Sequence, residues 1–416
     1  MRELGNVGEF ARRESAATDE RIAPILAAQR PGYPLSTRCY SDPEIFEREA
    51  ERFLLYHWHC AGHESQASEP GQFFTVEICG ESVIVVRGKD RLVRALINVC
   101  RHRGSRVCGA SAGKSPGGFV CPYHGWSYGL DGRLRAARQA PPDFDRAAHA
   151  LKPVHLRVIE GLIFISFAQD PPALDDVEQV LRASAGVHGW GDAEVAHRET
   201  YSIRANWKLA VENYMECYHC SPAHAEYSRV HVDHRPWELN REAIERLRER
   251  SRSLGIDIRD VDHWATRARS GQEAVMTARS TLVEGAVSGS SDGAPVAPLM
   301  GQFQSYEGGV TYFDVGPTSD FLAYSDHGLI YRFVPRTVTS TDMEVIWLVR
   351  RGARAGVDYD LERLTWLWRV TSAADKRIIE LNQEGINSRY YDPGAYTAME
   401  QPYTRRFIDW LLAELA

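Results

Sequence analysis

The sequence predicts an α+β protein in which a β-rich domain precedes a larger domain of mixed helices and strands. Its 416 residues are enough for two domains of ordinary size. Short β-type runs punctuated by glycine fill the chain from about residue 71 to 167, and Pro171-Pro172 marks a break after them. Beyond the break, helix-type segments mix with strands. We therefore expect an N-terminal arm at residues 1–45, a first domain at 46–170 and a second domain at 171–416.

The individual elements follow from local patterns. Residues 1–40 show no regular period and predict an irregular arm. Asp42 can cap a helix that Pro43 begins, and the pattern after it predicts a helix continuing to Trp58. Gly385 stands where a glycine that ends a helix is expected. The other expected strands are 73–78, 82–87, 92–99, 328–334 and 343–349, and the other expected helices are 175–183, 206–219, 241–250, 360–385 and 400–414.

Composition excludes several classes of function. Hydrophobic residues make up 44% and charged residues 25%, which is the balance of a soluble globular protein. The net charge of −7 gives a nucleic-acid partner no electrostatic support. The N-terminus lacks an apolar signal core, and no apolar run is long enough to cross a bilayer. We expect a cytoplasmic protein without a membrane partner, and we do not expect its eight cysteines to form a disulfide framework.

Two short Cys/His clusters lie in the first domain. One carries Cys100-x-His102 and the other carries Cys121-x-x-His124. Two such clusters on two loops of a β domain can converge on one metal centre, and thiolate with imidazole suits either zinc or an iron–sulfur cluster. Many zinc sites have two to four residues between their paired ligands, so the Cys-x-His spacing disfavours zinc.

A second group of metal-ligand residues lies in the second domain. On a continuous helix, Glu212, Glu216 and His219 would share one face, and Pro222 would end that helix so that His224 can turn back toward it. Two histidines and one carboxylate form the facial triad of non-haem Fe(II) oxygenases. The carboxylate must come from elsewhere in the chain. Asp375 and Glu380 are the candidates, although an acidic residue such as Asp375 can also simply stabilise a helix.

Both clusters together resemble one family, the α-subunits of Rieske ring-hydroxylating oxygenases. The first matches the Rieske motif Cys-x-His … Cys-x-x-His, and its flanking Gly104, Pro122 and Gly125-Trp126 also fit. The second matches Glu-Asn-x-x-(Asp/Glu)-x-Tyr-His-x-x-x-x-His, and the stretch from Asp375 to Gly385 resembles the segment that supplies the third ligand. The likeness covers roughly residues 40–412.

The resemblance implies a fold and a set of cofactors. It implies an N-terminal Rieske β domain with a [2Fe–2S] cluster and a C-terminal helix-grip (START-like) α/β catalytic domain with mononuclear Fe(II). The cluster ligands would be Cys100, His102, Cys121 and His124, and the iron ligands would be His219, His224 and Asp375. Replacing two thiolates by imidazoles raises the reduction potential of such a cluster. Asn213 and Glu216 would belong to the catalytic site.

The family's assembly is also implied. Subunits pack head to tail, usually as homotrimers, so that the cluster of one subunit serves the iron of its neighbour. The family usually has an aspartate three residues before the first iron-ligating histidine, which bridges the two centres. Glutamate stands there in this chain, as Glu216, and we expect it to contact His219 and, across the interface, His124 or His102.

The resemblance also implies partners and a reaction. O2 would be the co-substrate, and the electrons would come from a separate reductase that uses NAD(P)H and flavin, because this chain has no Gly-x-Gly-x-x-Gly after a strand. The expected activity is that of the oxygenase component of a multicomponent monooxygenase. The alternative from another class is a Rieske electron carrier or binding protein without oxygenase activity, which would hold two irons per chain instead of three.

The substrate expectation rests on finer likenesses. Glutamate at position 216 and the run from Tyr391 to Glu400 resemble the branch that acts on quaternary ammonium compounds such as glycine betaine, proline betaine, choline or carnitine. Such enzymes hydroxylate a carbon next to nitrogen, and a hydroxylated N-methyl group leaves as formaldehyde. The alternative is hydroxylation or cis-dihydroxylation of an aromatic acid. A quaternary ammonium cation is attracted to aromatic faces. The second domain offers several aromatic residues, none of which the sequence identifies as a binding residue: Tyr214, Phe303, Tyr312, Phe313, Phe321, Tyr324 and Tyr331.

Overall fold

The computed structural model describes residues 20–416, so the first 19 residues of the predicted arm lie outside it. Residues 20–27 are helical, so the expectation of a wholly irregular arm is wrong. Helix α2 (Pro43–Glu49) begins as predicted, with Pro43 in its first turn and the Asp42 side chain accepting a hydrogen bond from the backbone of Glu44. A π-helical turn (Ala50–Leu54) then ends the helical segment four residues before Trp58.

The segment before the first domain packs with the second domain. Phe53 and Leu54 are fully buried in the same core as Trp207, and the ring centroids of Phe53 and Trp207 lie 5.8 Å apart. Phe53 and Leu54 lie within the range expected for the first domain and contribute to the core of the second domain.

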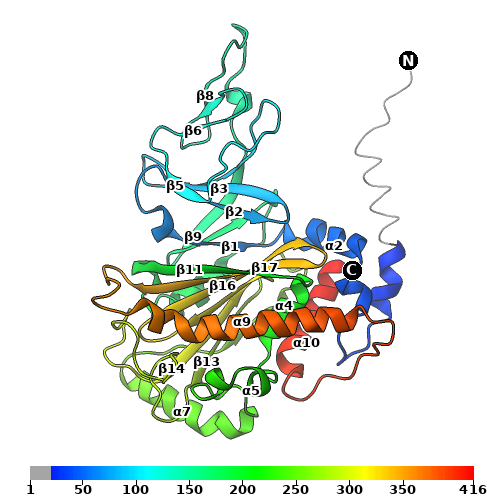
Figure 1. The fold of residues 1–416 in the computed structure, drawn as a ribbon, viewed down its shortest axis with the longest axis vertical. Helices are drawn as coiled ribbons and strands as arrows, with labels where there is room; N and C mark the ends of the chain where they lie inside the picture. The colour runs from blue at the N-terminus through cyan, green and yellow to red at the C-terminus, as the bar shows by residue number, and fades with distance from the viewer. Residues whose placement is uncertain (1–19) are drawn as a thin grey trace.

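The first domain is built on an antiparallel sheet. Its seven strands are hydrogen-bonded in the order β1-β10-β9-β4-β3-β2-β5, and a separate three-stranded sheet, β6-β7-β8, lies beyond them at the far end of the domain (Figure 1). The strands are β1 (His59–His63), β2 (Gln72–Ile78), β3 (Glu81–Arg87), β4 (Val93–Ile97), β5 (Ala112–Lys114), β6 (Phe119–Val120), β7 (Ser127–Tyr128), β8 (Leu134–Ala136), β9 (Pro153–Ile159) and β10 (Leu162–Ser166).

The second domain is a larger antiparallel sheet covered by helices. Its strands lie in the order β11-β17-β16-β15-β14-β13-β12. The long helix α9 (Leu361–Ile386) runs across one face, beside α4 (Trp207–Met215) and α10 (Gln401–Leu415) (Figure 1). The strands are β11 (Ala193–Ile203), β12 (Val261–Asp262), β13 (Val275–Thr281), β14 (Gly309–Val315), β15 (Ser319–Ala323), β16 (Gly328–Thr337) and β17 (Ser340–Arg350), and the remaining helices are α3 (Asp175–Ala183), α5 (Cys220–Ala223), α6 (Ala225–Ser228), α7 (Trp237–Ser253) and α8 (Trp264–Arg267).

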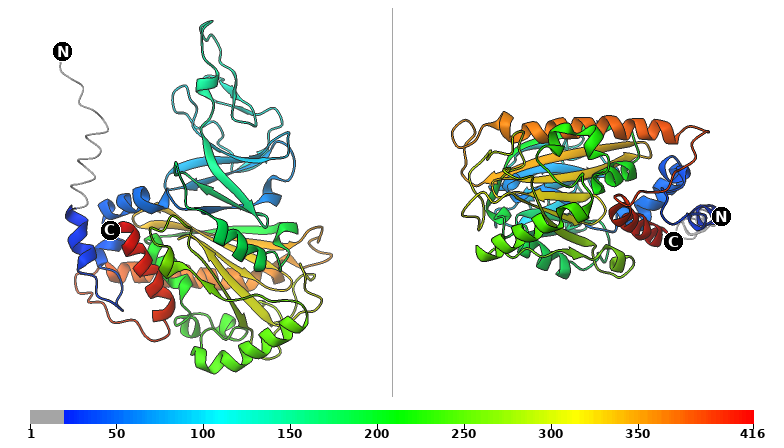
Figure 2. Two further views of the ribbon diagram at one scale, coloured as in Figure 1. Left: turned by 180° about the vertical axis from the view of Figure 1, so that it is seen from behind. Right: turned by 90° about the horizontal axis from the view of Figure 1, so that it is seen from below.

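The two faces of this sheet pack against different parts of the protein. Alternate side chains of β17, such as Val345 and Trp347, pack on the face covered by α4, α9 and α10. Their neighbours Ile346 and Leu348 pack on the other face, with Phe164 of the first domain and with α3. The apolar core on this second face contains residues of both domains and so joins them. The right-hand view in Figure 2 shows α9 along the opposite face of the sheet.

Gly385 does not end α9. The helix continues through Ile386 and is capped by Asn387, with Gly385 inside its last turn. None of the helices in residues 20–416 is long and apolar enough to cross a bilayer.

Candidate metal centres

The two loops of the first domain that carry the predicted cluster ligands each contain a backbone turn of the same kind. The backbone N–H of Gly104 donates to the carbonyl of Cys100, and that of Gly125 donates to the carbonyl of Cys121, each at 3.0 Å. Both glycines have positive φ angles, 75° and 74°. A residue with a Cβ is strained in this conformation. The repeated turn explains why glycine follows each Cys/His pair at the same distance from its cysteine.

The four side chains form a buried thiol pair and an outer imidazole pair. Cys100 and Cys121 are 3% and 2% exposed, whereas His102 is exposed and the ring centroids of His102 and His124 lie 4.6 Å apart. Burial acts to raise the pKa of Cys121, but the backbone N–H of Tyr123 and the side chain of Cys100 outweigh it and lower that pKa. Two thiolates behind two accessible imidazoles are the donor set of a Rieske cluster, so these residues fit a [2Fe–2S] group.

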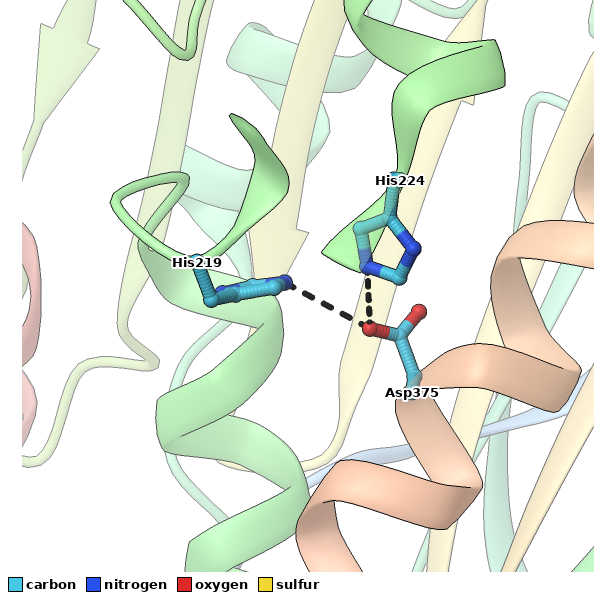
Figure 3. A group of neighbouring side chains, drawn as sticks. All are labelled: His219, His224 and Asp375. Atoms are coloured by element: carbon cyan, nitrogen blue, oxygen red, sulfur yellow. Dashed lines mark hydrogen bonds and ion pairs between the residues drawn. The ribbon is translucent and has the colours of Figure 1, made fainter. Parts of the chain in front are cut away.

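In the second domain, His219, His224 and Asp375 come together from two separate parts of the chain (Figure 3). Asp375 Oδ1 lies 2.7 Å from His224 Nε2 and 3.4 Å from His219 Nε2. One ligand atom from each residue lies within 4.8 Å of the others. His219 immediately precedes α5, His224 joins α5 to α6, and Asp375 projects from the middle of α9. The arrangement is that of a two-histidine, one-carboxylate triad.

The electrostatics of this triad favour a bound cation. Burial acts to lower the pKa of His219, but Asp375 and Glu216 outweigh it and raise that pKa to about 9. Burial likewise acts to raise the pKa of Asp375, and the two histidines reverse it and lower that pKa. The carboxylates thus attract positive charge to the point where the three ligand atoms meet. A divalent metal ion can take the place of the proton there.

Glu216 and Asn213 both touch His219. Glu216 Oε1 accepts a hydrogen bond from His219 Nδ1 at 2.7 Å, which leaves the Nε2 lone pair for a metal. Glu216 Oε2 also accepts from the backbone N–H groups of Tyr218 and His219. Asn213 Nδ2 lies 3.4 Å from His219 Nε2. The predicted bridging residue therefore orients the first histidine within its own subunit.

The local chain path differs from the expected helix. Helix α4 ends at Met215 instead of His219, and Glu216 is extended, with φ −123° and ψ 154°. The expectation that Glu212, Glu216 and His219 share one helix face is therefore wrong. Glu212 Oε1 instead accepts a hydrogen bond from Tyr40 at 2.8 Å, and burial raises the pKa of Glu212 to about 7.

Two further findings concern residues close to the triad. Glu380, the other candidate for the third ligand, binds the backbone and guanidinium of Arg204 and the amine of Lys376. Cys217 and Cys220 form a disulfide around His219. The expectation that the cysteines remain unpaired is thus wrong for these two. The Cys-x-x-Cys spacing of these two residues is the sequence signal for this disulfide.

The candidate aromatic residues divide between the two faces of the sheet. Tyr214, Tyr312, Tyr324 and Tyr331 pack on the face covered by α9, which also carries Asp375. Phe313 and Phe321 pack on the opposite face, and Phe303 belongs to a small separate cluster. Only the four tyrosines therefore lie on the side of the triad.

Comparison with known protein families finds two matching domains. The model of the Rieske [2Fe-2S] domain matches residues 57–156, and that of the ring hydroxylating alpha subunit (catalytic domain) matches residues 190–416. The predictions of an N-terminal Rieske domain and a C-terminal catalytic domain in an α+β fold are thereby confirmed, and zinc no longer accounts for the first cluster. The catalytic domain also sets the chain apart from a simple Rieske electron carrier.

Comparison with individual proteins points the same way. The chain is 34% identical over 95% of its length to the glycine betaine monooxygenase oxygenase subunit of Chromohalobacter salexigens, covering 88% of that protein. It is 38% identical over half its length to the carnitine monooxygenase oxygenase subunit of Escherichia coli, covering 57% of that protein. The fold matches the crystal structure of the quaternary ammonium Rieske monooxygenase CntA with L-carnitine at TM-score 0.68 and 22% identity, covering 95% of this chain and 97% of that one.

Proposed function

This chain belongs to the family of Rieske ring-hydroxylating oxygenase α-subunits, and we propose that it is the oxygenase component that hydroxylates a small quaternary ammonium compound. A betaine-like compound hydroxylated on an N-methyl group would release formaldehyde, so the net reaction is N-demethylation. The relative that aligns along nearly the whole chain is named for glycine betaine, which supports this substrate class.

The residues beside the triad carry the proposal. Tyr331 lies near Ser372, one turn before Asp375 on α9, with 3.4 Å between the two hydroxyl oxygens. The ring centroid of Tyr331 lies 6.4 Å from that of Trp368 and 5.1 Å from that of Tyr214. Aromatic faces next to the iron ligands suit a quaternary ammonium group, which makes no hydrogen bonds and is attracted to π faces. The alternative substrate, an aromatic acid, would instead require a cationic side chain that binds its carboxylate.

Within the proposal, each polar residue has a defined task. His219, His224 and Asp375 would hold Fe(II), and the bound iron would supply open coordination positions for O2. Glu216 keeps the His219 imidazole in the tautomer whose Nε2 faces the metal site. Cys100, His102, Cys121 and His124 would hold the [2Fe–2S] cluster, which passes electrons from a separate flavin-containing, NAD(P)H-dependent reductase. Because NAD(P)H is a cytoplasmic reductant, the cytoplasm is the proposed location.

The placement of the two centres supports electron transfer between subunits. The cluster loops adjoin β6 at the far end of the first domain, away from α5 and α9 of the same chain (Figure 1). A hollow of about 970 Å³ opens beside them, lined by His102, His124 and Trp126 among others. We therefore expect a homotrimer in which this end of one subunit meets the catalytic domain of the next.

A mixing experiment tests this assembly. A His102→Ala variant lacks a working cluster and an Asp375→Ala variant lacks the iron, so each is inactive alone. Co-expression under two affinity tags yields mixed oligomers in which one subunit can reduce its neighbour's iron, and these should regain part of the activity. Mixed oligomers as inactive as either parent would contradict transfer between subunits.

The substrate class is tested with the purified oxygenase and a suitable reductase. O2 uptake and formaldehyde release are measured with a panel of betaines, choline, carnitine and aromatic acids. Formaldehyde released in step with O2 uptake for a quaternary ammonium compound is the expected result. Product formed only from aromatic acids would overturn the substrate class and leave the oxygenase assignment intact.

A further inference from the structure

A partly buried carboxylate, Asp233, lies between α6 and α7 and is held by three hydroxyl groups. Tyr312 donates to its Oδ2 at 2.7 Å, Tyr227 donates to the same oxygen at 3.3 Å, and Ser280 donates to Oδ1 at 2.9 Å. The two phenol oxygens lie 3.1 Å apart. Within residues 20–416, Asp233 forms no ion pair with a lysine, arginine or histidine. Neutral donors alone therefore compensate this carboxylate.

Removing part of this carboxylate from water has a free-energy cost in the folded protein. Burial raises the pKa of Asp233, and the three hydroxyl bonds offset only part of that effect. A structural anchor for the loop would need hydrogen bonds but no charge, and asparagine could supply them. A cation bound nearby would remove the cost, because an opposite charge favours the ionised form of a buried carboxyl.

Asp233 lies at one end of an aromatic cluster whose other end lies on α9, the helix that carries Asp375. Tyr227 follows His224 by three residues on α6. The ring centroid of Tyr227 lies 6.1 Å from that of Trp368 and 3.9 Å from that of His231, on which it stacks. Trp368 precedes Asp375 by two helical turns on α9. The cluster thus connects the Asp233 carboxylate to the elements that carry the iron ligands.

The hydrogen bonds of the two tyrosine hydroxyl groups also change the charge distribution of their rings. When Tyr227 and Tyr312 donate their phenol protons to a carboxylate, electron density shifts toward each ring. A more negative ring face attracts a cation more strongly. The Asp233 carboxylate and the two tyrosine rings therefore all attract a cation.

Two other carboxylates, which are buried in the sheet of the second domain, differ from Asp233 in this respect. Asp314 and Asp320 are register partners on β14 and β15. Asp314 also lies 3.5 Å from the guanidinium of Arg406, so the pair already has a cation. Asp320 thus offers a matched control for Asp233.

We propose that Asp233 is a specificity-determining residue that, through Tyr227 and Tyr312, selects substrates with a cationic ammonium head group over neutral ones of the same shape. This inference rests on the proposed function and deepens it. The ligand class it defines is a trimethylammonium or similarly alkylated ammonium compound.

The test compares a cation with its neutral isostere. Equilibrium binding to the holoenzyme, and KM against kcat, are measured for glycine betaine and for 3,3-dimethylbutanoate, in which a tert-butyl group replaces trimethylammonium. Asp233→Asn should weaken binding of the betaine at least about tenfold, because a nearby charge is removed. Binding of the isostere should change by less than about twofold.

Two further variants keep the test decisive. Tyr312→Phe retains the ring and loses one donor to Asp233, so it should shift the preference in the same direction by a smaller factor, and it decides the matter if Asp233→Asn does not fold. Asp320→Asn should leave the preference unchanged. The inference is overturned if Asp233→Asn leaves the preference for the betaine unchanged, or, where that variant does not fold, if Tyr312→Phe does. An equal shift in Asp320→Asn would also overturn it. In each of these cases, wild-type binding of the betaine would still support the proposed function. If the wild-type enzyme binds no quaternary ammonium compound, the proposed function itself fails.

Discussion

Glu216 is the residue whose removal tests the link between the two metal centres. Its carboxylate accepts a 2.7 Å hydrogen bond from His219 Nδ1, and its second oxygen accepts from two backbone N–H groups. A glutamine at this position can accept from Nδ1, but its NH2 group then faces those N–H donors. The variant Glu216→Gln therefore loses charge assistance and at least one backbone bond.

The size of the effect follows from these bonds. A hydrogen bond to a charged group contributes about 1.5–3 kcal/mol, against about 0.5–1.5 kcal/mol for a neutral one. The difference of about 1–1.5 kcal/mol corresponds to roughly a tenfold loss of iron affinity, so iron still binds at working concentrations. If Glu216 also contacts His102 or His124 of the next subunit, electron transfer should suffer more than iron binding.

Single-turnover measurements separate these two effects. The pre-reduced variant is mixed with O2 and substrate, and reoxidation of the cluster is followed beside product formed. We expect Glu216→Gln to retain both metals but to yield much less product per cluster oxidised. Glu212→Gln is the matched control, because Glu212 is a partly buried glutamate in the same segment that accepts a hydrogen bond from Tyr40. Normal product yield in Glu216→Gln, or an equal loss in Glu212→Gln, would refute the reasoning.

Three more predictions concern the cluster, Glu212 and the disulfide. His102→Ala or Cys121→Ala should abolish the Rieske paramagnetic signal of the reduced protein, whereas a colourless wild-type protein that holds only zinc would contradict the cluster. Because burial raises the pKa of Glu212 from 4.5 to about 7, the folded state keeps its proton when the unfolded state has lost it, and the wild-type protein should lose about 3 kcal/mol of stability between pH 4.5 and 7. Denaturant unfolding of Glu212→Gln should lack this loss, and parallel pH profiles would refute it. Alkylation of the denatured, unreduced protein should label six of the eight cysteines and leave Cys217 and Cys220 unlabelled, whereas labelling of all eight would contradict the disulfide.

The sequence predicted best what depends on short spacing. The two Cys/His loops were identifiable because ligand spacing and turn glycines are local properties, and Gly104 and Gly125 do adopt the same turn. The helix at residues 175–183 has the predicted bounds. Only the resemblance favoured Asp375 as the third ligand, since nothing local distinguishes it from any acidic residue on a helix.

What the sequence could not predict depends on distant partners. The helix expected to reach His219 ends at Met215, because Glu216 turns out of it to bind His219 and two backbone N–H groups. Glu212 is turned away by Tyr40, which lies 172 residues earlier in the chain. At the end of α9, the Gln383 side chain accepts a hydrogen bond from the backbone of Asn206, and the helix runs past the glycine expected to end it. Each of these contacts is tertiary and leaves no local pattern.

Iron quantitation tests the central claim, two separate metal centres in one oxygenase chain, most directly. Iron and acid-labile sulfide are measured per chain in the wild-type protein and in Asp375→Ala after anaerobic purification. We predict three irons and two sulfides in the wild-type protein, and two irons, two sulfides and an intact Rieske signal in the variant. Two irons in the wild-type protein, or three in Asp375→Ala, would contradict the account.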